Sequence, residues 1–365
     1  ILTAAEMPSE LIQFVSHPQF AKTITGVELG KNLESIDRIL KIVKNHTGYD
    51  FFSYKKPTLL RRTAKRMNIT KCDTAEDYID FLYDNPDEKF TLVDEFLIGV
   101  TKFFRDPVAY QILENQVIPD IIEEKRSRGH AIKVWVVACS TGEEAYSLAI
   151  LFEEYLATKN FNLKYKIFAT DIDSKAIDVA AKGFYSENIA TDVSQQRLST
   201  YFIRKENGFQ IQPSVRKNII FSKHDILQHP PFNKMDLISC RNMLIYIDNN
   251  VQLKVLSSLH YALNKNGYLF MGSSESIGIL NKNFTEINSK WKIYRNVLPT
   301  KMVNVDANAW RIEDRTTGTA KRSRQTITLE DKVIKAVNRD LMTEMEAVCV
   351  CVDEHFDIVY ASGKF

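Results

Sequence analysis

Residues 132–151, IKVWVVACSTGEEAYSLAIL, decide the fold of this chain. They open with an apolar run of β-branched and aromatic side chains, residues 134–137, which is typical of a strand buried on both faces. Small and polar residues follow at 138–142, and apolar residues then recur at helical spacing over 143–151, behind two acidic residues. This order of strand, tight turn and helix predicts the first unit of a nucleotide-binding α/β domain.

The turn also indicates which ligand the unit holds. Only Gly142 of a G-x-G-x-x-G fingerprint is present, so a nicotinamide dinucleotide fits poorly. Glu143 and Glu144 stand at the start of the helix and would repel a phosphate there. A ligand with a positive charge and no phosphate suits the turn better, and S-adenosylmethionine (SAM) is such a ligand.

Composition narrows the class of protein. A chain of 365 residues accommodates two or three domains, and 44% hydrophobic with 26% charged residues is usual for a soluble globular protein. A net charge of +2 gives no overall attraction for nucleic acid, and no apolar run approaches the roughly 20 residues of a membrane span. The five cysteines include no C-x-x-C pair and the seven histidines lack ligand spacing. We therefore expect reduced thiols, no metal site and a cytoplasmic location.

The spacing of apolar residues divides the chain. Residues 31–115 have helical periodicity and predict a small all-α domain. Residues 116–296 alternate strand and helix patterns, which predicts a mainly parallel sheet with helices on both faces. Short antiparallel strands interrupt the alternation at about 184–217. Residues 219–221 are either the last of them or the strand with which the main alternation resumes. We expect residues 224–227 to form a further strand, and 291–294 to form the edge strand of the sheet.

The two ends of the chain are expected to lie outside these domains. Residues 1–30 are expected to be a short helix and a connection that follow another module. Residues 297–328 are polar and charged, as linkers are. Residues 329–365 combine a helix with two strands joined by an acidic turn, as at the start of a further domain.

Polar residues gather where the predicted strands end. Asp171 follows the second strand, where nucleotide-binding folds hold the ribose hydroxyls. The alternative, that an acid there only caps the next helix, is expected of Asp173 or Ser174. Another predicted strand, residues 235–240, leads into Arg241, Asn242 and Tyr246, which therefore stand where ligands bind.

The segment before the second group of helices carries a cation among aromatic residues. Pro107 is expected to begin a helix with Asp106 as its cap. Phe103 and Phe104 are expected to anchor the segment in apolar surface. Arg105 then either pairs with a neighbouring acid or holds a carboxylate bidentately.

A helix predicted over residues 59–67 has a strongly basic face, formed by Arg61, Arg62, Lys65 and Arg66. Such a face is a solvated surface or a site for an acidic partner.

Residues 229–232, HPPF, resemble the turn of amino-group methyltransferases, but they precede the strand that they should follow. We therefore interpret them as a plain loop, which disfavours a methyltransferase that acts on nitrogen or RNA.

Four motifs occur in order along the chain: TKFFR (101–105), ACSTGEEAYS (138–147), ATDID (169–173) and CRNMLIY (240–246). Over residues 33–296 the sequence resembles the CheR-type chemotaxis receptor methyltransferases. The resemblance implies a small all-α domain followed by a Rossmann-like, SAM-dependent methyltransferase domain with an antiparallel β insertion. It also implies O-methylation of glutamate carboxylates on chemoreceptor helices, with S-adenosylhomocysteine (SAH) as the second product.

The resemblance assigns roles to individual residues. Cofactor contacts are implied for Thr101, Arg105, Glu144, Asp171, Asp225, Ile226, Arg241 and Asn242. Catalytic roles are implied for Arg105 and Tyr246. The basic residues Arg61, Arg62, Lys65 and Arg66 match the face that the family offers to the receptor.

The sequence also departs from the family pattern. Gly99 stands where many members have Asn, Ala145 where Pro is common, and Asp225 where some have Asn. The departure at Gly99 leaves open a non-catalytic signalling module that binds SAM or SAH.

The two ends of the chain resemble other modules. Residues 1–20 resemble the tail of a CheB-type methylesterase and residues 329–365 the start of a PAS domain, which implies an esterase–methyltransferase–PAS fusion.

Overall fold

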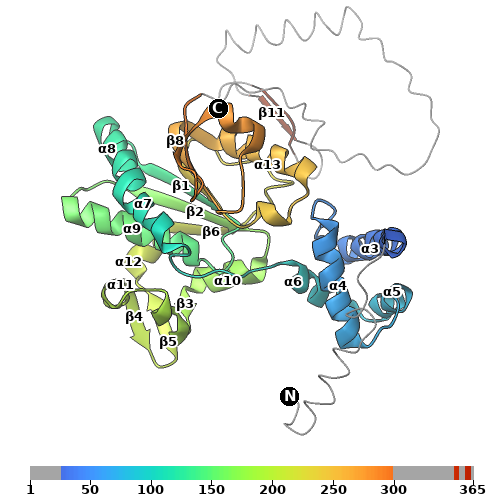
Figure 1. The fold of residues 1–365 in the computed structure, drawn as a ribbon. Coiled ribbons are helices and arrows are strands. Elements are labelled where there is room, and N and C mark those ends of the chain that lie inside the picture. Colours follow the sequence, from blue (N-terminus) through green and yellow to red (C-terminus); the bar gives the residue numbers. More distant parts are fainter. Residues whose placement is uncertain (1–25, 299–348, 353–357, 363–365) are drawn as a thin grey trace, which may run out of the picture. The chain divides into compact units, whose positions relative to one another are not determined.

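The computed structural model describes residues 26–298, 349–352 and 358–362. The chain separates into two compact units, Ile1–Ala307 and Asn308–Phe365. The described part of the first unit consists of a helical domain followed by a sheet domain (Figure 1). The helix predicted within residues 1–25, the linker and the helix predicted after residue 329 all lie outside the described residues.

The helical domain confirms the predicted periodicity. Its apolar stripes bury a core in which Phe51, Tyr78 and Phe96 are almost fully enclosed. The Thr74 side chain accepts from the Asp77 backbone and Asp77 accepts from the Thr74 backbone, a capping box that starts the third helix. The helices are α3 Gly26–Thr47, α4 Lys56–Thr70, α5 Ala75–Asp84 and α6 Pro86–Phe96.

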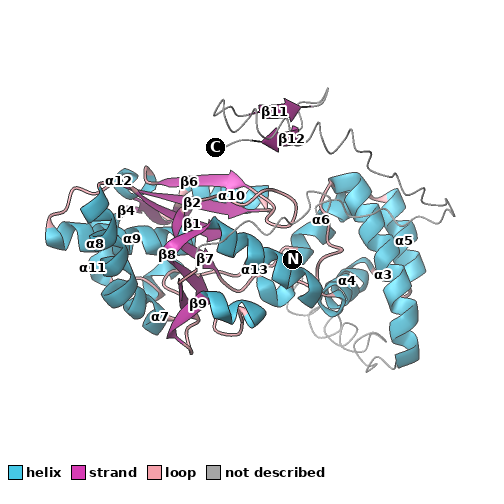
Figure 2. Cartoon of the chain, turned by 90° about the horizontal axis from the view of Figure 1, so that it is seen from above, coloured by secondary structure: helices cyan, strands magenta, loops and turns pink. Residues whose placement is uncertain are grey.

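The sheet domain contains a seven-stranded sheet in the order β6-β2-β1-β7-β8-β10-β9 (Figure 2). The strands from β6 to β8 are parallel, β10 is antiparallel to β8, and β9 is antiparallel to β10. The strand order changes direction between β1 and β7, so ligands are expected at the carboxyl ends there. The strands are β1 Ile132–Val137, β2 Tyr165–Asp171, β6 Ile219–Lys223, β7 Met235–Cys240, β8 Leu263–Met271, β9 Phe284–Asn288 and β10 Ile293–Asn296.

Helices cover both faces of the sheet, which confirms that β1 is buried on both sides. Val134 and Val136 belong to one apolar core, and Trp135 and Val137 belong to another on the opposite face. Helices α8 and α9 contribute to the first core and α13 to the second. The helices are α7 Pro107–Ile112, α8 Ile118–Arg128, α9 Glu143–Lys159, α10 Ser174–Lys182 and α13 Asn249–Ala262, with a π-helical turn at Leu113–Val117.

The predicted antiparallel insertion is present as a separate three-stranded sheet in the order β3-β5-β4. The Tyr185 hydroxyl donates to the Thr141 carbonyl oxygen at 2.7 Å, which ties the insertion to the turn after β1. The insertion comprises β3 Phe184–Tyr185, α11 Gln195–Tyr201, β4 Phe202–Lys205, β5 Gly208–Ile211 and α12 Pro213–Arg216.

Residues 219–221, for which two interpretations were open, belong to β6, which pairs in parallel with β2 in the main sheet. Two strand predictions were wrong. Residues 224–227 form a turn because the Asp225 carboxylate accepts the Leu227 backbone N–H, which competes with strand pairing. The edge strand is β9, because it pairs with β10 on the side away from β8. Residues 229–232 lie in a loop, as predicted, and Phe232 packs against Trp135.

The described part of the second unit is an antiparallel strand pair, β11 Cys349–Val352 and β12 Ile358–Ser362. These are the two strands predicted in this region. Among the helices that the structure describes, none combines the length and the apolar character needed to cross a membrane.

Candidate functional site

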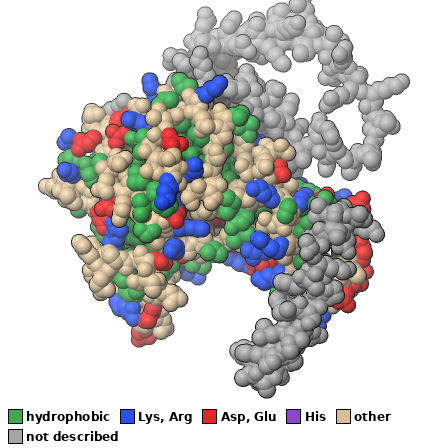
Figure 3. Space-filling model, viewed as in Figure 1, with side chains coloured by type: hydrophobic (Ala, Val, Ile, Leu, Met, Phe, Trp, Pro, Cys, Tyr) green, Lys and Arg blue, Asp and Glu red, His purple; other side chains and the backbone are tan. Residues whose placement is uncertain are grey.

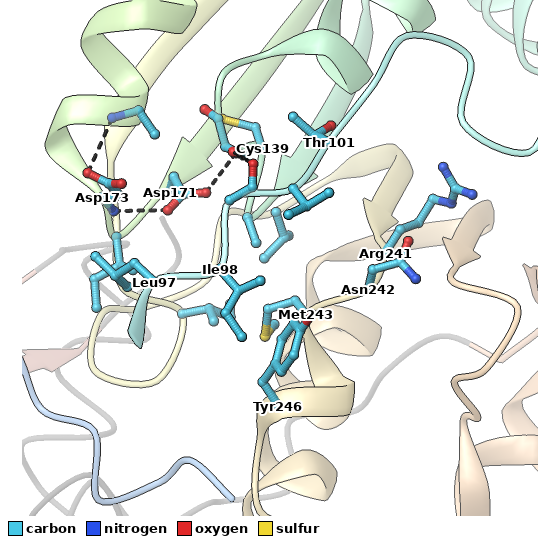
Figure 4. Close-up of a pocket in the computed structure, with 18 of the residues that line it drawn as sticks. Leu97, Ile98, Thr101, Cys139, Asp171, Asp173, Arg241, Asn242, Met243 and Tyr246 are labelled. Carbon is cyan, nitrogen blue, oxygen red and sulfur yellow. Dashed lines mark hydrogen bonds between the residues drawn. The ribbon is translucent and has the colours of Figure 1, made fainter. Parts of the chain in front are cut away.

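A pocket lies at the carboxyl ends of β1, β2 and β7. In Figure 4, Asp171 and Asp173 lie on one side of it, and Arg241 and Asn242 lie across it. The pocket brings together every residue for which the sequence predicted a cofactor contact or a catalytic role. These residues are Thr101, Arg105, Glu144, Asp171, Asp225, Ile226, Arg241, Asn242 and Tyr246.

The turn after β1 brings backbone close to the pocket. Gly142 has a φ of +95°, and a Cβ there would lie 2.8 Å from the Ala180 Cβ, so only glycine fits without strain. The Ser140 hydroxyl donates to the Gly99 carbonyl oxygen at 3.0 Å, which connects the turn to the loop after α6. The small residues of this turn therefore allow the backbone to lie close to α10 and to the loop after α6.

Asp171 holds the turns at the ends of both β1 and β2. One carboxylate oxygen accepts the Ser140 N–H at 2.7 Å and the other accepts the Asp173 N–H at 2.9 Å. Burial raises the pKa of Asp171 above the usual range for aspartate. Each oxygen retains a lone pair, so the carboxylate can also accept from a diol. Asp173 caps α10 through the Lys175 and Ala176 N–H groups, as predicted for one of the two candidates.

Arg241 is a buried cation that organises the acids of the pocket. Its side chain is only 1% exposed and stacks on Phe270 with 4.3 Å between guanidinium and ring centre. Its guanidinium donates to Glu144 at 3.2 Å and to Asp106 at 2.5 Å. Glu144 also accepts from the Ser239 hydroxyl at 2.6 Å, so its position in the pocket is well defined.

Asp106 occupies the N-cap position of α7, as predicted, but its side chain does not act as the cap. The residue has a φ of +65° and makes no capping hydrogen bond. Its carboxylate instead pairs with Arg241, because a charged donor is a stronger partner than an exposed backbone N–H.

The segment that carries Thr101 and Arg105 is anchored by its two phenylalanines. Phe103 packs edge-on against Tyr185 of the insertion, and the Phe104 N–H donates to the Ser147 hydroxyl of α9 at 3.0 Å. The Arg105 guanidinium donates to the Val100 carbonyl oxygen at 3.1 Å and forms no ion pair with any described residue. Of the two alternatives for Arg105, a salt bridge to a neighbouring acid is thus not observed, and donors remain for a carboxylate.

Asp225 and Ile226, which come directly after β6 in the chain, form one wall of the pocket. The Asp225 carboxylate accepts from the Leu227 N–H at 2.8 Å and from the Gln228 side-chain amide at 2.9 Å. Ile226 is largely buried and presents apolar surface beside it. This wall therefore combines an oriented acid with an apolar side chain, which suits the edge and face of a purine.

Sequence reasoning missed Glu275, which shapes the loop after β7. This side chain is 5% exposed, and its carboxylate accepts three backbone N–H groups, those of Asn242 at 2.9 Å, Leu244 at 2.7 Å and Gly272 at 2.8 Å. Burial raises the pKa of Glu275 above the usual range for glutamate. The available signal was an acid shortly after a predicted strand, because side chains at that end of β8 face the same edge of the sheet.

The basic face of α4 is largely engaged within the helical domain. Glu95 of α6 accepts from Arg62 at 2.6 Å and from Lys65 at 3.0 Å, and Glu88 pairs with Arg66 at 2.7 Å. Arg61 is exposed and has no partner among the described residues. Figure 3 accordingly shows basic and acidic side chains next to one another on the visible part of this domain.

Comparison with known proteins connects both domains to one family. Residues 99–293 match the family model described as CheR methyltransferase, SAM binding domain, and residues 34–97 match CheR methyltransferase, all-alpha domain. The chemotaxis protein methyltransferase of Listeria monocytogenes is 34% identical over 241 residues, which cover 65% of this chain and 88% of that protein.

A longer relative comes from Rhodobacter capsulatus, an uncharacterized 104.1 kDa protein in the hypE 3' region. It is 32% identical over 336 residues, which cover 91% of this chain and 34% of that protein. The chain thus spans about a third of the length of this relative.

Proposed function

The chain belongs to the CheR methyltransferase family, and from that premise we propose that it transfers methyl groups from SAM to glutamate side chains of chemoreceptor signalling helices. The observation that carries the proposal is the pocket at the ends of β1, β2 and β7, which unites the acids and the free cation that this chemistry needs. The name of the Listeria relative, chemotaxis protein methyltransferase, supports the receptor as substrate.

The residues of the pocket fit SAM better than a phosphorylated cofactor. Asp171 can accept from the ribose hydroxyls, and Glu144 can accept from the ammonium group of the methionine part. Arg241, the buried cation nearby, is already paired with Glu144 and Asp106 and is not available for a phosphate. Asp225 and Ile226 would then face the adenine.

The chain's own residues have a limited chemical task. SAM supplies an electrophilic methyl group when it is bound. A glutamate side chain has a pKa of about 4.3 and is ionised at neutral pH, so no general base is required. We assign the orientation of this carboxylate to Arg105 and Tyr246, which line the same pocket. Because attack cancels two charges, alignment at about 3 Å and partial exclusion of water should accelerate the reaction.

The partners follow from the same family. An acidic receptor helix would meet Arg61 directly and would compete with Glu95 and Glu88 for the other cations of α4. The Rhodobacter relative supports a longer polypeptide with fused modules, because it matches 91% of this chain yet is about three times as long. We propose an esterase-like module before residue 31, a PAS-like domain after residue 328 and a cytoplasmic location.

Binding of the cofactor is the first test. Asp171→Ala should weaken the binding of SAM and SAH by about ten- to a hundredfold, because it removes charge-assisted hydrogen bonds to the ribose. Isothermal titration calorimetry measures both dissociation constants. Asp178→Ala removes an exposed acid from α10 and should leave both unchanged. A folded wild-type protein that binds neither ligand would overturn the proposed function.

Turnover tests the role of the free cation. Arg105→Ala should lower kcat for methyl transfer to receptor helices at least about tenfold, because the acceptor carboxylate loses its oriented donor, while the protein stays folded. Transfer of radiolabelled methyl groups to receptor fragments measures the rate. Lys102→Ala, in the same segment but 55% exposed, is the matched control. Normal turnover in Arg105→Ala would exclude a catalytic role for this residue, and cofactor binding without transfer to any receptor would favour a non-catalytic signalling module.

A further inference from the structure

A short segment of the helical domain is paired with the loop that carries Tyr246. Tyr54 forms an isolated antiparallel bridge with Ile247. The Lys55 N–H donates to the Tyr246 carbonyl oxygen at 2.8 Å, and the Asp248 N–H donates to the Ser53 carbonyl oxygen at 2.8 Å. These backbone bonds hold the segment between α3 and α4 at the rim of the pocket.

The side chain of Tyr54 forms part of the pocket wall. Its ring packs edge-on against Phe51, with 5.1 Å between the centroids, and Phe51 in turn packs against Phe96 in the core of the helical domain. The ring is therefore held from behind by a packed core, and the backbone is held on both sides of it. Such support gives a side chain a defined position before a ligand binds.

The Tyr54 hydroxyl makes no hydrogen bond with any residue that the structure describes. Burial and the negative charges of Asp225 and Asp171 raise the pKa of Tyr54, so the phenol keeps its proton at neutral pH and acts as a donor. Both acids already accept other donors, Asp171 from two backbone N–H groups and Asp225 from Leu227 and Gln228. The Tyr54 side chain is only partly buried, so a ligand in the pocket that it lines can supply an acceptor for its hydroxyl.

The position of Tyr54 indicates which part of the ligand supplies that acceptor. Asp171 is the proposed ribose ligand, and Asp225 with Ile226 is the proposed adenine wall. Ribose oxygens and purine ring nitrogens are the acceptors expected beside these two acids, whereas the other acceptor of the cofactor, the carboxylate of its methionine part, belongs to the portion placed at Glu144. We infer that the Tyr54 hydroxyl donates a hydrogen bond to the nucleoside part of the cofactor, so that the helical domain contributes a residue to the cofactor site. This inference rests on the proposed function and adds a binding residue to it.

The nucleoside is common to SAM and SAH, so the inference expects the same effect on both ligands. Tyr54→Phe removes only the hydroxyl and should weaken the binding of both ligands by about three- to tenfold, by the same factor for each. Tyr54→Ala also removes the ring and should weaken both further. Isothermal titration calorimetry of the full chain with SAM and with SAH measures two dissociation constants for the wild type and for each variant. Tyr83→Phe, on a side chain that is 64% exposed in the same domain, should change neither.

Each outcome decides between the two proposals. Binding by the wild type with an unchanged affinity in Tyr54→Phe would overturn the role of the hydroxyl and leave the proposed function intact. A loss confined to SAM or to SAH would also overturn it, because the nucleoside is common to both. No binding by the folded wild type would overturn the proposed function and this inference with it. Circular dichroism of each variant establishes that it is folded.

Discussion

Replacement of Arg241 by alanine is expected to lower the free energy of unfolding by about 3–5 kcal/mol, because it leaves Glu144 without its cation in a pocket where that acid is largely buried. The substitution also removes the stacking on Phe270 and the hydrogen bond to the Arg105 carbonyl oxygen. Since Glu144 then loses its fixed position, SAM binding should weaken at least about tenfold. Urea denaturation measures the first effect and calorimetry the second.

Arg295→Ala is the matched control for this prediction. Arg295 lies in β10 of the same sheet, pairs with Asp120 at 3.2 Å and lies over Tyr268, but its side chain is 34% exposed. Because solvent screens such a pair, its loss should cost less than about 1 kcal/mol. Equal losses in the two variants would contradict a special role of Arg241, as would a loss below about 1 kcal/mol for Arg241→Ala.

The second large effect is expected at Glu275. Glu275→Ala should lower the free energy of unfolding by about 3 kcal/mol or more, because three backbone N–H groups lose their acceptor and each buried, unpaired donor costs about 1–3 kcal/mol. The loop after β7 carries Arg241, Asn242 and Tyr246, so methyl transfer should fall together with stability. Urea denaturation and the receptor methylation assay measure the two quantities on the same preparation.

Two variants separate these causes. Glu275→Gln keeps the shape and one acceptor oxygen, so its loss of stability should be smaller than that of Glu275→Ala. Glu286→Ala removes an exposed acid from β9 and should change neither stability nor turnover appreciably. A Glu275→Ala protein with wild-type stability would show that the three N–H groups find other partners.

Local patterns correctly predicted the helices and strands that are fixed by hydrogen bonds close in sequence or by the burial of apolar side chains. The run at residues 134–137 forms a strand buried on both faces, because alternate residues enter two separate cores. The strand–turn–helix order brought Asp171 to the correct end of the sheet, because all parallel strands of such a fold present their carboxyl ends at one edge. The helical periodicity of the first domain was equally reliable, since a single apolar stripe per helix defines its core.

The wrong predictions concern choices between competing partners. Asp106 was expected to cap the helix that it precedes, but it pairs with Arg241, 135 residues later. The turn at 224–227 was expected to be a strand, but the Asp225 carboxylate accepts the Leu227 backbone N–H. The strand at Ile293–Asn296 was placed at the edge, although a further strand pairs with it. For Asp106 and for the edge strand, a partner that local sequence does not identify was decisive, whereas at 224–227 a local bond from side chain to backbone outweighed strand propensity.

By itself the sequence determined the two-domain architecture, the direction of the sheet and the place of Asp171, Arg241, Asn242 and Tyr246 at its carboxyl edge, because periodicity and strand ends are local properties. The other predicted pocket residues were implied by the family resemblance. Only the tertiary structure decided how these residues are used. It buried Arg241 among acids, left Arg105 with free donors, placed Glu275 beneath the loop of Asn242 and Tyr246, and brought Tyr54 from the helical domain to the pocket wall. Hydrogen bonds and ion pairs between distant segments depend on the relative placement of whole elements, which no single stretch of sequence specifies.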